Sequence, residues 1–270
     1  MILSLRNVSY SYPDGTPALR DVNLEVRSGE IAFVMGPNGS GKTTLLLLMA
    51  GLLTPTEGGV TFYGKPLGNW FRKHCGILFQ DPRDQLLAPT VWEDVALAPK
   101  QLGLDEGEVM SRVEEALRYF GIEDLASRSP LRLSRGQAAK VILAGLLAHD
   151  PEVLLLDEPW SSLDAEGTEH LLELIKLFKE RNRIVVISSQ NSDMAAEISD
   201  TVHILKNGEL VMSGLASDLL VRVEELREIG IRPPLVPSVS RMIFPADPPV
   251  LRFEDLLDRL ERTNSRSSRP

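Results

Sequence analysis

A glycine-rich segment followed by Lys-Thr is the part of this sequence whose residue types and spacing most directly suggest chemistry. Residues 36–44 read Gly-Pro-Asn-Gly-Ser-Gly-Lys-Thr-Thr. Glycines at these positions allow a tight turn in which successive backbone N–H groups point inward, and such a turn binds phosphate. Lys42 is placed to reach the β- and γ-phosphates of a nucleotide, and the Thr43 hydroxyl to bind Mg²⁺. The residues expected to contact the nucleotide here are Gly36, Pro37, Asn38, Gly39, Ser40, Gly41, Lys42, Thr43 and Thr44.

The residues on either side of this segment supply the context that a phosphate-binding loop needs. Ile31–Met35 is a continuous apolar run that predicts a buried strand, and Leu45–Leu53 is an apolar stretch that predicts a helix. A helix that begins at the glycine loop adds the positive end of its dipole to the phosphate site. A glycine-rich turn before an ordinary helix is the alternative, but strand, loop, Lys-Thr pair and helix all stand in the register of the motif.

Two carboxylates follow a second apolar run. Val153–Asp157 predicts a buried strand, and Glu158 comes directly after it. We expect Asp157 to hold Mg²⁺, directly or through water, and Glu158 to polarise the attacking water as a general base. An Asp-Glu pair after a strand is weak evidence on its own. Together with the glycine loop, it predicts hydrolysis of a nucleoside triphosphate.

The composition is ordinary for a soluble globular protein. The chain has 270 residues, enough for one large core or two modest domains. Hydrophobic residues make up 43% and charged residues 25%, and the net charge is −9. This acidic balance argues against a nucleic-acid-binding surface spread over the whole chain. The single cysteine, Cys75, excludes an intramolecular disulfide and suits a reducing compartment.

Neither a signal peptide nor a membrane-spanning helix is predicted. Met1–Arg6 lacks the basic start and the long apolar region of a signal peptide and instead predicts a strand. The apolar runs fall far short of the ~20 residues that a membrane helix needs. We therefore expect any role at a membrane to depend on partner proteins.

The predicted elements alternate in a way that favours an α/β fold. Leu3–Tyr12 and Ala18–Val26 alternate like half-buried strands, with a turn at Asp14-Gly15 between them. The later all-apolar strands alternate with helices, which indicates a parallel sheet covered on both faces. From about residue 91 to 147 the pattern is helical and polar. Further strands are expected at Val60–Tyr63, Cys75–Phe79, Ile184–Ser188, Val202–Leu205 and Glu209–Met212, the last two forming a hairpin.

The character of the chain changes after about residue 215. Asp218–Ile229 predicts one amphipathic helix. Residues 232–249 are rich in proline and are expected to be extended. Phe253–Leu260 predicts a short helix, and the Ser/Arg-rich residues 263–270 are expected to form a disordered tail.

A third motif lies between the glycine loop and the carboxylate pair. Leu133-Ser-Arg-Gly-Gln137 resembles the Leu-Ser-Gly-Gly-Gln signature of ABC-type ATPases, Ser161–Asp164 resembles their D-loop, and Gln80 matches their glutamine loop. The resemblance covers residues 1 to about 215, with the motifs in the right order. It implies a P-loop NTPase with a RecA-like parallel or mixed sheet, an N-terminal antiparallel β subdomain, a helical subdomain at about 88–147 and a small C-terminal extension at 216–270.

The resemblance also implies how ATP would be used. Two such domains face each other head to tail, and the ATP on one P-loop is covered by the signature of the other chain. Ser134 and the backbone N–H of Gly136 would donate to the γ-phosphate on the partner, while Gln80 would reach Mg²⁺ and the attacking water. Tyr12 fits the aromatic residue that stacks on adenine, with packing in the core as the alternative. The signature residues expected to contact nucleotide are Ser134, Arg135, Gly136 and Gln137.

Two residues depart from the family pattern. Gln190 stands where the family has a switch histidine. Glutamine can donate a neutral hydrogen bond to the γ-phosphate but cannot carry a positive charge, so it either slows hydrolysis at this chain's own site or substitutes adequately. Arg135 replaces a signature glycine and either meets the partner's phosphates or ribose or is a solvated surface residue. Together, these departures suggest a pair of unequal ATPases.

The segment Phe79–Val95 discriminates best between subtypes. It is similar to the glutamine loop of the ATPases in energy-coupling factor (ECF) importers, which take up vitamins or Co²⁺/Ni²⁺. The resemblance implies a place on the cytoplasmic face of the cell membrane and no nucleic-acid partner. Asp81 and Asp84 could pair with arginines of a coupling protein, or be solvated loop carboxylates. The implied partners are a second ABC ATPase (non-identical, or otherwise a second copy), a transmembrane coupling protein and a substrate-capturing membrane subunit.

The C-terminal segment carries a further resemblance. Gly230–Pro234, followed by a short acidic helix, is also similar to the ECF-type ATPases, whose extension helps the two ATPases to dimerise. An ATPase of a conventional ABC importer or exporter would carry the same motifs and pair with different permeases. A soluble ABC ATPase acting on DNA or ribosomes usually has two nucleotide domains or a coiled-coil insertion, and neither is seen in this sequence.

Overall fold

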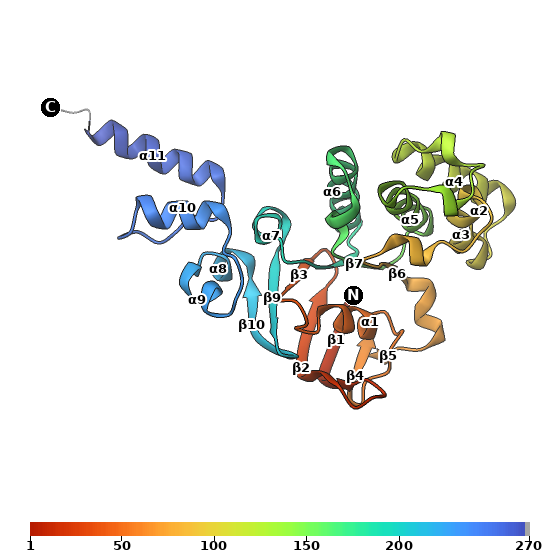
Figure 1. Cartoon of the computed structure of the whole chain (residues 1–270), viewed down its shortest axis with the longest axis horizontal. Helices are drawn as coiled ribbons and strands as arrows, with labels where there is room; N and C mark the ends of the chain where they lie inside the picture. Colours follow the sequence, from red (N-terminus) through yellow and green to blue (C-terminus); the bar gives the residue numbers. More distant parts are fainter. Residues whose placement is uncertain (268–270) are drawn as a thin grey trace.

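A six-stranded sheet forms the centre of the computed structural model, which describes residues 1–267 (Figure 1). Its strand order is β10-β9-β3-β8-β7-β6, and every neighbouring pair is parallel except β10 and β9. Strands β3, β7 and β8 are buried along their whole length, which explains their unbroken apolar sequences. The strands are β3 (Ile31–Met35), β6 (Cys75–Leu78), β7 (Val153–Asp157), β8 (Ile184–Ser188), β9 (Thr201–Lys206) and β10 (Glu209–Leu215).

The two faces of this sheet are covered by different layers, because alternate side chains along each strand point to opposite faces. Val153 and Leu155 pack with helix α1 (Lys42–Met49) and a second, antiparallel sheet. Leu154 and Leu156 pack instead with α6 (Ala165–Glu180), α7 (Ser192–Ile198) and the helical subdomain. The expected α/β fold with a parallel sheet covered on both faces is therefore confirmed.

The N-terminal antiparallel sheet has the order β2-β1-β4-β5 and confirms the strands expected at the start of the chain. Apolar side chains of β1 and β2 alternate into the interface with α1. The helices of the helical subdomain lie beside β6, the edge strand of the central sheet (Figure 1). The antiparallel strands are β1 (Ile2–Ser11), β2 (Pro17–Arg27), β4 (Glu57–Phe62) and β5 (Lys65–Pro66), and the subdomain helices are α2 (Val91–Val95), α3 (Leu97–Gln101), α4 (Glu106–Tyr119) and α5 (Arg135–His149).

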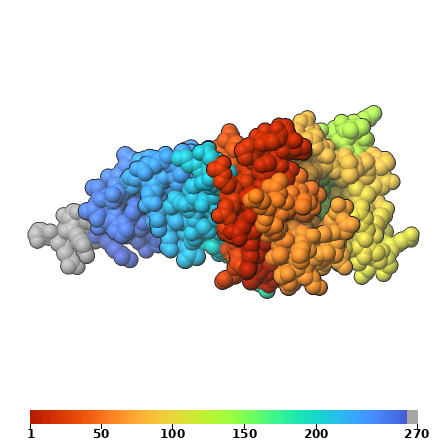
Figure 2. Space-filling view, turned by 90° about the horizontal axis from the view of Figure 1, so that it is seen from below, coloured from red at the N-terminus to blue at the C-terminus, as the bar shows by residue number. Residues whose placement is uncertain are grey.

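The C-terminal extension leaves the central sheet after β10 and projects from the end of the molecule opposite the helical subdomain (Figure 2). The backbone N–H of Leu235 donates to the Asp193 carboxylate of α7 over 2.6 Å, which ties the extension to the core. Its helices are α8 (Ala216–Leu219), α9 (Val223–Glu228), α10 (Leu235–Ile243) and α11 (Phe253–Ser267), and five short 3₁₀ segments elsewhere are η1 (Asn69–His74), η2 (Pro82–Gln85), η3 (Glu123–Leu125), η4 (Pro130–Arg132) and η5 (Pro159–Ser162).

Three sequence-based expectations for the extension were wrong. The single helix expected at 218–229 is two short helices, α8 and α9. The segment expected to be extended contains α10, because Pro237 falls in its first turn, where no backbone N–H has an intrahelical acceptor. The short helix expected at Phe253–Leu260 is longer, because no glycine or proline interrupts α11 before Ser267. Residues 268–270 of the expected tail lie outside the described residues.

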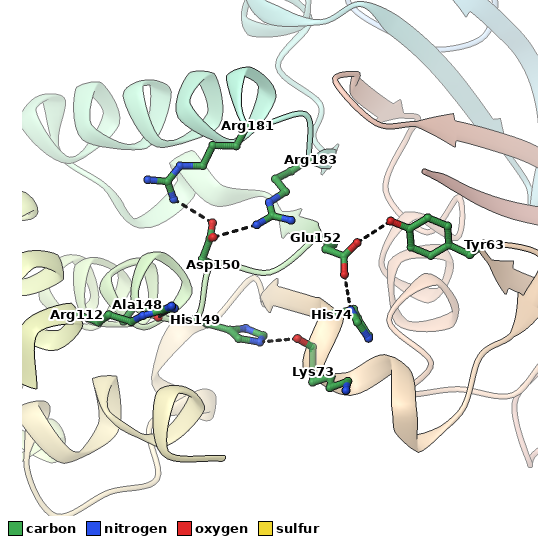
Figure 3. Close-up of polar contacts among 10 residues, drawn as sticks. All are labelled: Tyr63, Lys73, His74, Arg112, Ala148, His149, Asp150, Glu152, Arg181 and Arg183. Atoms are coloured by element: carbon green, nitrogen blue, oxygen red, sulfur yellow. Dashed lines mark hydrogen bonds and ion pairs between the residues drawn. The ribbon is translucent and has the colours of Figure 1, made fainter. Parts of the chain in front are cut away.

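A cluster of polar side chains surrounds the amino end of β7 (Figure 3). We call it the amino-end cluster. The glycine loop lies at the carboxyl ends of the parallel strands, which is the opposite end of the sheet. Asp150 accepts from Arg181 over 3.0 Å and from Arg183 over 2.9 Å. Glu152 accepts from the Tyr63 hydroxyl over 2.9 Å and also pairs with His74. The cluster joins the antiparallel sheet, the helical subdomain and the core, and its members are Tyr63, His74, His149, Asp150, Glu152, Arg181 and Arg183.

Candidate functional site

The glycine loop joins β3 to α1, and its close packing requires glycine at two positions. Gly36 has a φ of 153°, and a Cβ there would lie 2.2 Å from the carbonyl oxygen of Leu205. Gly41 has a φ of 104° and precedes the first residue of α1, where a Cβ would lie 2.7 Å from the carbonyl oxygen of Ala18. Larger residues would force the loop away from β2 and β9. The loop conformation therefore depends on glycine, as the motif predicts.

Lys42 lies inside the loop rather than in solvent. Its side chain is 8% exposed, and Nζ donates to the carbonyl oxygens of Gly36 over 2.8 Å and Pro37 over 3.0 Å. Burial lowers the pKa of Lys42, while the negative charges of Glu158 and Asp157 act in the opposite direction. The hydroxyl of Ser40 is also buried in this loop and has no hydrogen-bond partner within the described residues. The loop thus presents a cation and an unpartnered hydroxyl to the same cleft.

Asp157 meets the loop at the carboxyl end of β7. Thr43 Oγ1 donates to Asp157 Oδ2 over 2.7 Å, and the Ser188 hydroxyl donates to the other carboxylate oxygen. Parallel pairing places Asp157 opposite Ser188, so the ends of β7 and β8 are level. A hydroxyl and a carboxylate are oxygen ligands of the type that Mg²⁺ prefers when nucleotide phosphates supply the rest. Thr43 and Asp157 therefore fit that ion, while Gln80 lines the same cleft but forms no hydrogen bond with them within the described residues.

Glu158 has an unusual backbone conformation that directs its carboxylate into the cleft. Its φ is 45°, in the left-handed region that non-glycine residues rarely adopt, and such strain is concentrated at functional sites. The Ser189 hydroxyl donates to Oε2 over 2.9 Å, and the backbone N–H of Gln190 donates to Oε1 over 3.1 Å. Sequence reasoning missed Ser189. Its signal was a hydroxyl residue directly after a buried strand that is level with β7.

Gln190 connects two loops at the edge of the cleft. Its side-chain Nε2 donates to Asn38 Oδ1 in the glycine loop over 2.5 Å. Gln190 and Gln80 both line the cleft, together with Lys42 and Glu158. The cleft has a volume of about 600 Å³, enough for a nucleotide.

Tyr12 stands at the outer end of the same cleft. It is 38% exposed, and its hydroxyl forms a 2.9 Å hydrogen bond with Thr44 Oγ1 of the glycine loop. Its ring meets the edge of Tyr10 at a centroid distance of 5.2 Å, and Tyr10 is the one that is buried. Tyr12 therefore presents an accessible ring rather than packing in the core.

The signature residues are not part of this cleft within one chain. Ser134 caps α5, where its hydroxyl accepts from the backbone N–H of Gln137 over 3.2 Å. Gln137 Oε1 in turn accepts from the backbone N–H of Ser134 over 3.0 Å, which completes a capping box. Arg135 donates to the carbonyl oxygen of Gln80, and Gly136 packs close to the carbonyl oxygen of Ser162. The signature thus begins a helix whose first residues do not line the chain's own cleft.

One of the two acidic residues expected to bind a coupling protein is paired within the chain. Asp81 accepts from Arg83 Nη2 over 2.8 Å and from Arg83 Nε over 3.1 Å. These bonds lower the pKa of Asp81 to about 2. Asp84 makes no ion pair within the described residues. Asp84 is therefore the more accessible of the two carboxylates for a cationic partner.

The comparisons with known proteins agree with this geometry. The ABC transporter family model matches residues 19–161. The chain is 37% identical over 252 residues to the energy-coupling factor transporter ATP-binding protein EcfA of Methanocaldococcus jannaschii, covering 91% of this chain and 90% of that protein. It is 42% identical over 242 residues to the cobalt import ATP-binding protein CbiO of Rhodobacter capsulatus, covering 87% and 86%. It spans only 53% of a putative ABC transporter ATP-binding protein of Methanosarcina mazei, with 40% identity.

Solved structures show the same fold. CbiO1 of Clostridium perfringens, described as part of the ABC transporter complex CbiONQ, superposes with a TM-score of 0.71 at 33% identity, covering 88% of this chain and 97% of that one. A dimeric ATP-binding cassette in a post-hydrolysis state, bound to ADP and Pi, also gives a TM-score of 0.71, at 31% identity over 79% of this chain and 98% of that one. The matched family model, the identities over most of the chain and the assembled cleft show that this protein belongs to the ABC transporter ATP-binding family.

Proposed function

We propose that this chain is the ATP-hydrolysing motor subunit of an ECF-type importer. The observation that carries the proposal is the meeting of Lys42, Asp157 and Glu158 in one cleft beneath the glycine loop. Backbone N–H groups of the loop and the start of α1 bind the phosphates, and Tyr12 stacks on the base. Thr43, Asp157 and Gln80 serve the metal site, where bound Mg²⁺ would neutralise phosphate charge.

Glu158 is the residue we assign to proton transfer. Its carboxylate is oriented by Ser189 and by the backbone of Gln190, so it is held at the cleft as a general base for water. Neither donor is cationic, so these bonds orient the carboxylate without forming an ion pair with it. Gln190 can add a neutral hydrogen bond to the γ-phosphate in place of the family's histidine.

We propose that the working unit is a head-to-tail dimer. Ser134 and Gly136 lie outside their own cleft, which is where a signature must lie in order to cover the nucleotide of a second chain. The C-terminal extension supports this arrangement because it carries an apolar surface on α10 and α11. The exposed side chains are Leu235, Met242, Ile243, Phe253 and Leu257. Such a surface suits contact with a second ATPase.

The importer subtype rests on the relatives. Proteins named for energy-coupling factor transport and cobalt import match this chain over most of its length. Within residues 1–267, the helices are too short or too polar for any of them to cross a bilayer. We propose that the chain works at the cytoplasmic face of the membrane with a coupling protein and a substrate-capturing subunit, and that the cargo is a vitamin or a Co²⁺ or Ni²⁺ ion.

Co-purification from the native host tests the assembly. The tagged chain would be solubilised from membranes in mild detergent, and its partners identified by mass spectrometry. A second ABC ATPase with one multi-spanning coupling protein is the expected result. A pair of conventional permeases would point to a conventional ABC importer or exporter, and recovery without any membrane protein would contradict a transport role.

Replacing Gln190 tests the idea of unequal ATPase sites. We expect Gln190→His to raise the ATP turnover of the purified complex by about three- to tenfold, because a charged imidazole stabilises the γ-phosphate better than a neutral amide. Gln190→Ala, which removes the side chain that contacts Asn38, should lower it. Equal turnover in all three proteins would show that this position does not limit hydrolysis.

A further inference from the structure

Arg135 connects the signature segment to the glutamine loop of the same chain. Its guanidinium Nη2 donates to the backbone carbonyl oxygen of Gln80 over 3.0 Å. Arg135 is the first residue of α5 and follows the helix cap Ser134 directly. The signature that this segment resembles has glycine at this position, and glycine has no side chain with which to form such a bond. The contact therefore arises from a residue in which this chain departs from its family.

The glutamine loop is fixed at its base, and Arg135 binds it at Gln80, the next residue. Gln85 Oε1 accepts from the backbone N–H of Phe79 over 2.7 Å, and Gln85 Nε2 donates to the carbonyl oxygen of Ile77 over 2.9 Å. These two bonds hold the segment just before Gln80. The carbonyl oxygen of Gln80 is then bound by Arg135, and Gln80 is one of the residues that line the cleft.

The charges around this contact favour its formation. Asp81 follows Gln80 directly, and its carboxylate, although paired with Arg83, also attracts the Arg135 guanidinium. A hydrogen bond from a charged donor is stronger than one between neutral groups, although its exposure to water limits its contribution to stability. The bond is therefore better suited to orient a loop than to stabilise the fold.

We propose that Arg135 is a positioning residue for Gln80: by binding the Gln80 carbonyl, it holds the glutamine side chain in the nucleotide cleft of its own chain. This inference rests on the proposed ATPase function. It also means that the signature segment, which covers the partner's nucleotide, and Gln80, which serves the chain's own cleft, move together. Replacing Arg135 by a residue without a hydrogen-bond donor removes this link between the signature segment and Gln80.

Hydrogen exchange of the full-length chain tests the contact without any assumption about activity. In Arg135→Ala, the amides of residues 79–85 should exchange several-fold faster than in wild type, because the backbone at Gln80 loses its hydrogen bond to Arg135. Arg132→Ala is the matched control. It removes the same charge three residues earlier, from a side chain with no hydrogen bond or ion pair within the described residues. Exchange in Arg135→Ala equal to wild type, or equally accelerated in Arg132→Ala, would overturn the proposal.

A double-mutant cycle then tests whether Arg135 acts through Gln80. Arg135→Ala should lower the kcat for ATP about three- to tenfold with little change in KM, whereas Arg132→Ala should change neither. In a Gln80→Ala background the carbonyl remains but the positioned side chain is gone, so Arg135→Ala should cause no further loss. A raised KM for ATP with unchanged kcat, or an equal loss of kcat in both backgrounds, would mean that Arg135 acts elsewhere. Absence of turnover in wild type would instead contradict the proposed function and leave the exchange test to decide the positioning role.

Discussion

The two ends of strand β7 carry acidic residues with different kinds of hydrogen-bond partner. At the carboxyl end, Asp157 and Glu158 accept hydrogen bonds only from hydroxyls and a backbone N–H. Neither forms an ion pair in the part of the chain that the structure describes. At the amino end, roughly 17 Å away for five residues of strand, Asp150 and Glu152 are paired with cationic or phenolic groups (Figure 3).

The partner type decides what each carboxylate can do. Hydroxyl and amide donors fix the orientation of a carboxylate without cancelling its negative charge, which stays available to attract a metal ion. Arginine side chains at hydrogen-bond distance cancel that charge locally and cross-link the elements that carry them. The carboxyl end of β7 is therefore equipped for chemistry, and the amino end holds the subdomains together.

The largest expected difference between the ends concerns catalysis. Glu158→Gln should lower ATP turnover by at least about a hundredfold, because the amide cannot accept the proton of water. ATP binding should persist, seen as a rise in Tm on adding Mg-ATP. The matched change Glu152→Gln, at the other end of the strand, should leave turnover within about twofold of wild type. Comparable losses in the two variants would contradict the division of roles.

Substitutions at the amino end of β7 are expected to lower the stability of the fold. Asp150→Asn should destabilise the chain by about 1–3 kcal/mol, because two arginines lose their charged acceptor. Arg183 is the more buried partner, 24% exposed against 42% for Arg181, so Arg183→Ala should cost more than Arg181→Ala. Asp124→Asn is the control, since Asp124 pairs with Arg128 on the surface at 71% exposure. Urea unfolding midpoints measure all four, and a loss in Asp124→Asn as large as in Asp150→Asn would refute the structural role.

Elements that a local sequence pattern specifies could be predicted, and elements that depend on contacts between distant residues could not. The buried strands were predictable because their apolar runs are continuous, and the glycine loop because its residues are adjacent in the sequence. Helix α10 was missed because proline in a first turn looks the same in sequence as proline in an extended segment.

In the candidate site, the residues of the sequence motifs could be predicted, but the hydrogen bonds between distant residues could not. Lys42, Thr43, Asp157 and Glu158 were predictable as residue types in a motif. The bond from Ser189 to Glu158 and the bond from Arg135 to Gln80 join residues 31 and 55 positions apart. No pattern within a window specifies such pairs, since they depend on how strand ends and loops are aligned in three dimensions. Sequence reasoning identified Arg135 as unusual but left two places open for it, the partner's nucleotide or the solvated surface, and neither includes Gln80.

The smallest expected effect is a pH dependence of stability that arises from His149 in the amino-end cluster. His149 Nε2 forms a 3.0 Å hydrogen bond with the carbonyl oxygen of Lys73, and burial lowers the pKa of His149 below its usual 6.5. The unfolded chain therefore takes up a proton at a higher pH than the folded chain does. The stability that depends on neutral His149 is present above pH 6.5 and is lost as pH falls below it toward the folded pKa.

His149→Gln should remove this part of the pH dependence, because a glutamine amide can donate to the Lys73 carbonyl and does not titrate. Urea midpoints measured at about pH 7.5 and about pH 5.5 should fall less in the variant than in wild type. His203, whose pKa burial lowers to about 4, contributes to both proteins alike, so the difference between them isolates His149. An equal fall in both would mean that the pKa of His149 is the same in the folded and the unfolded chain, which would contradict the prediction.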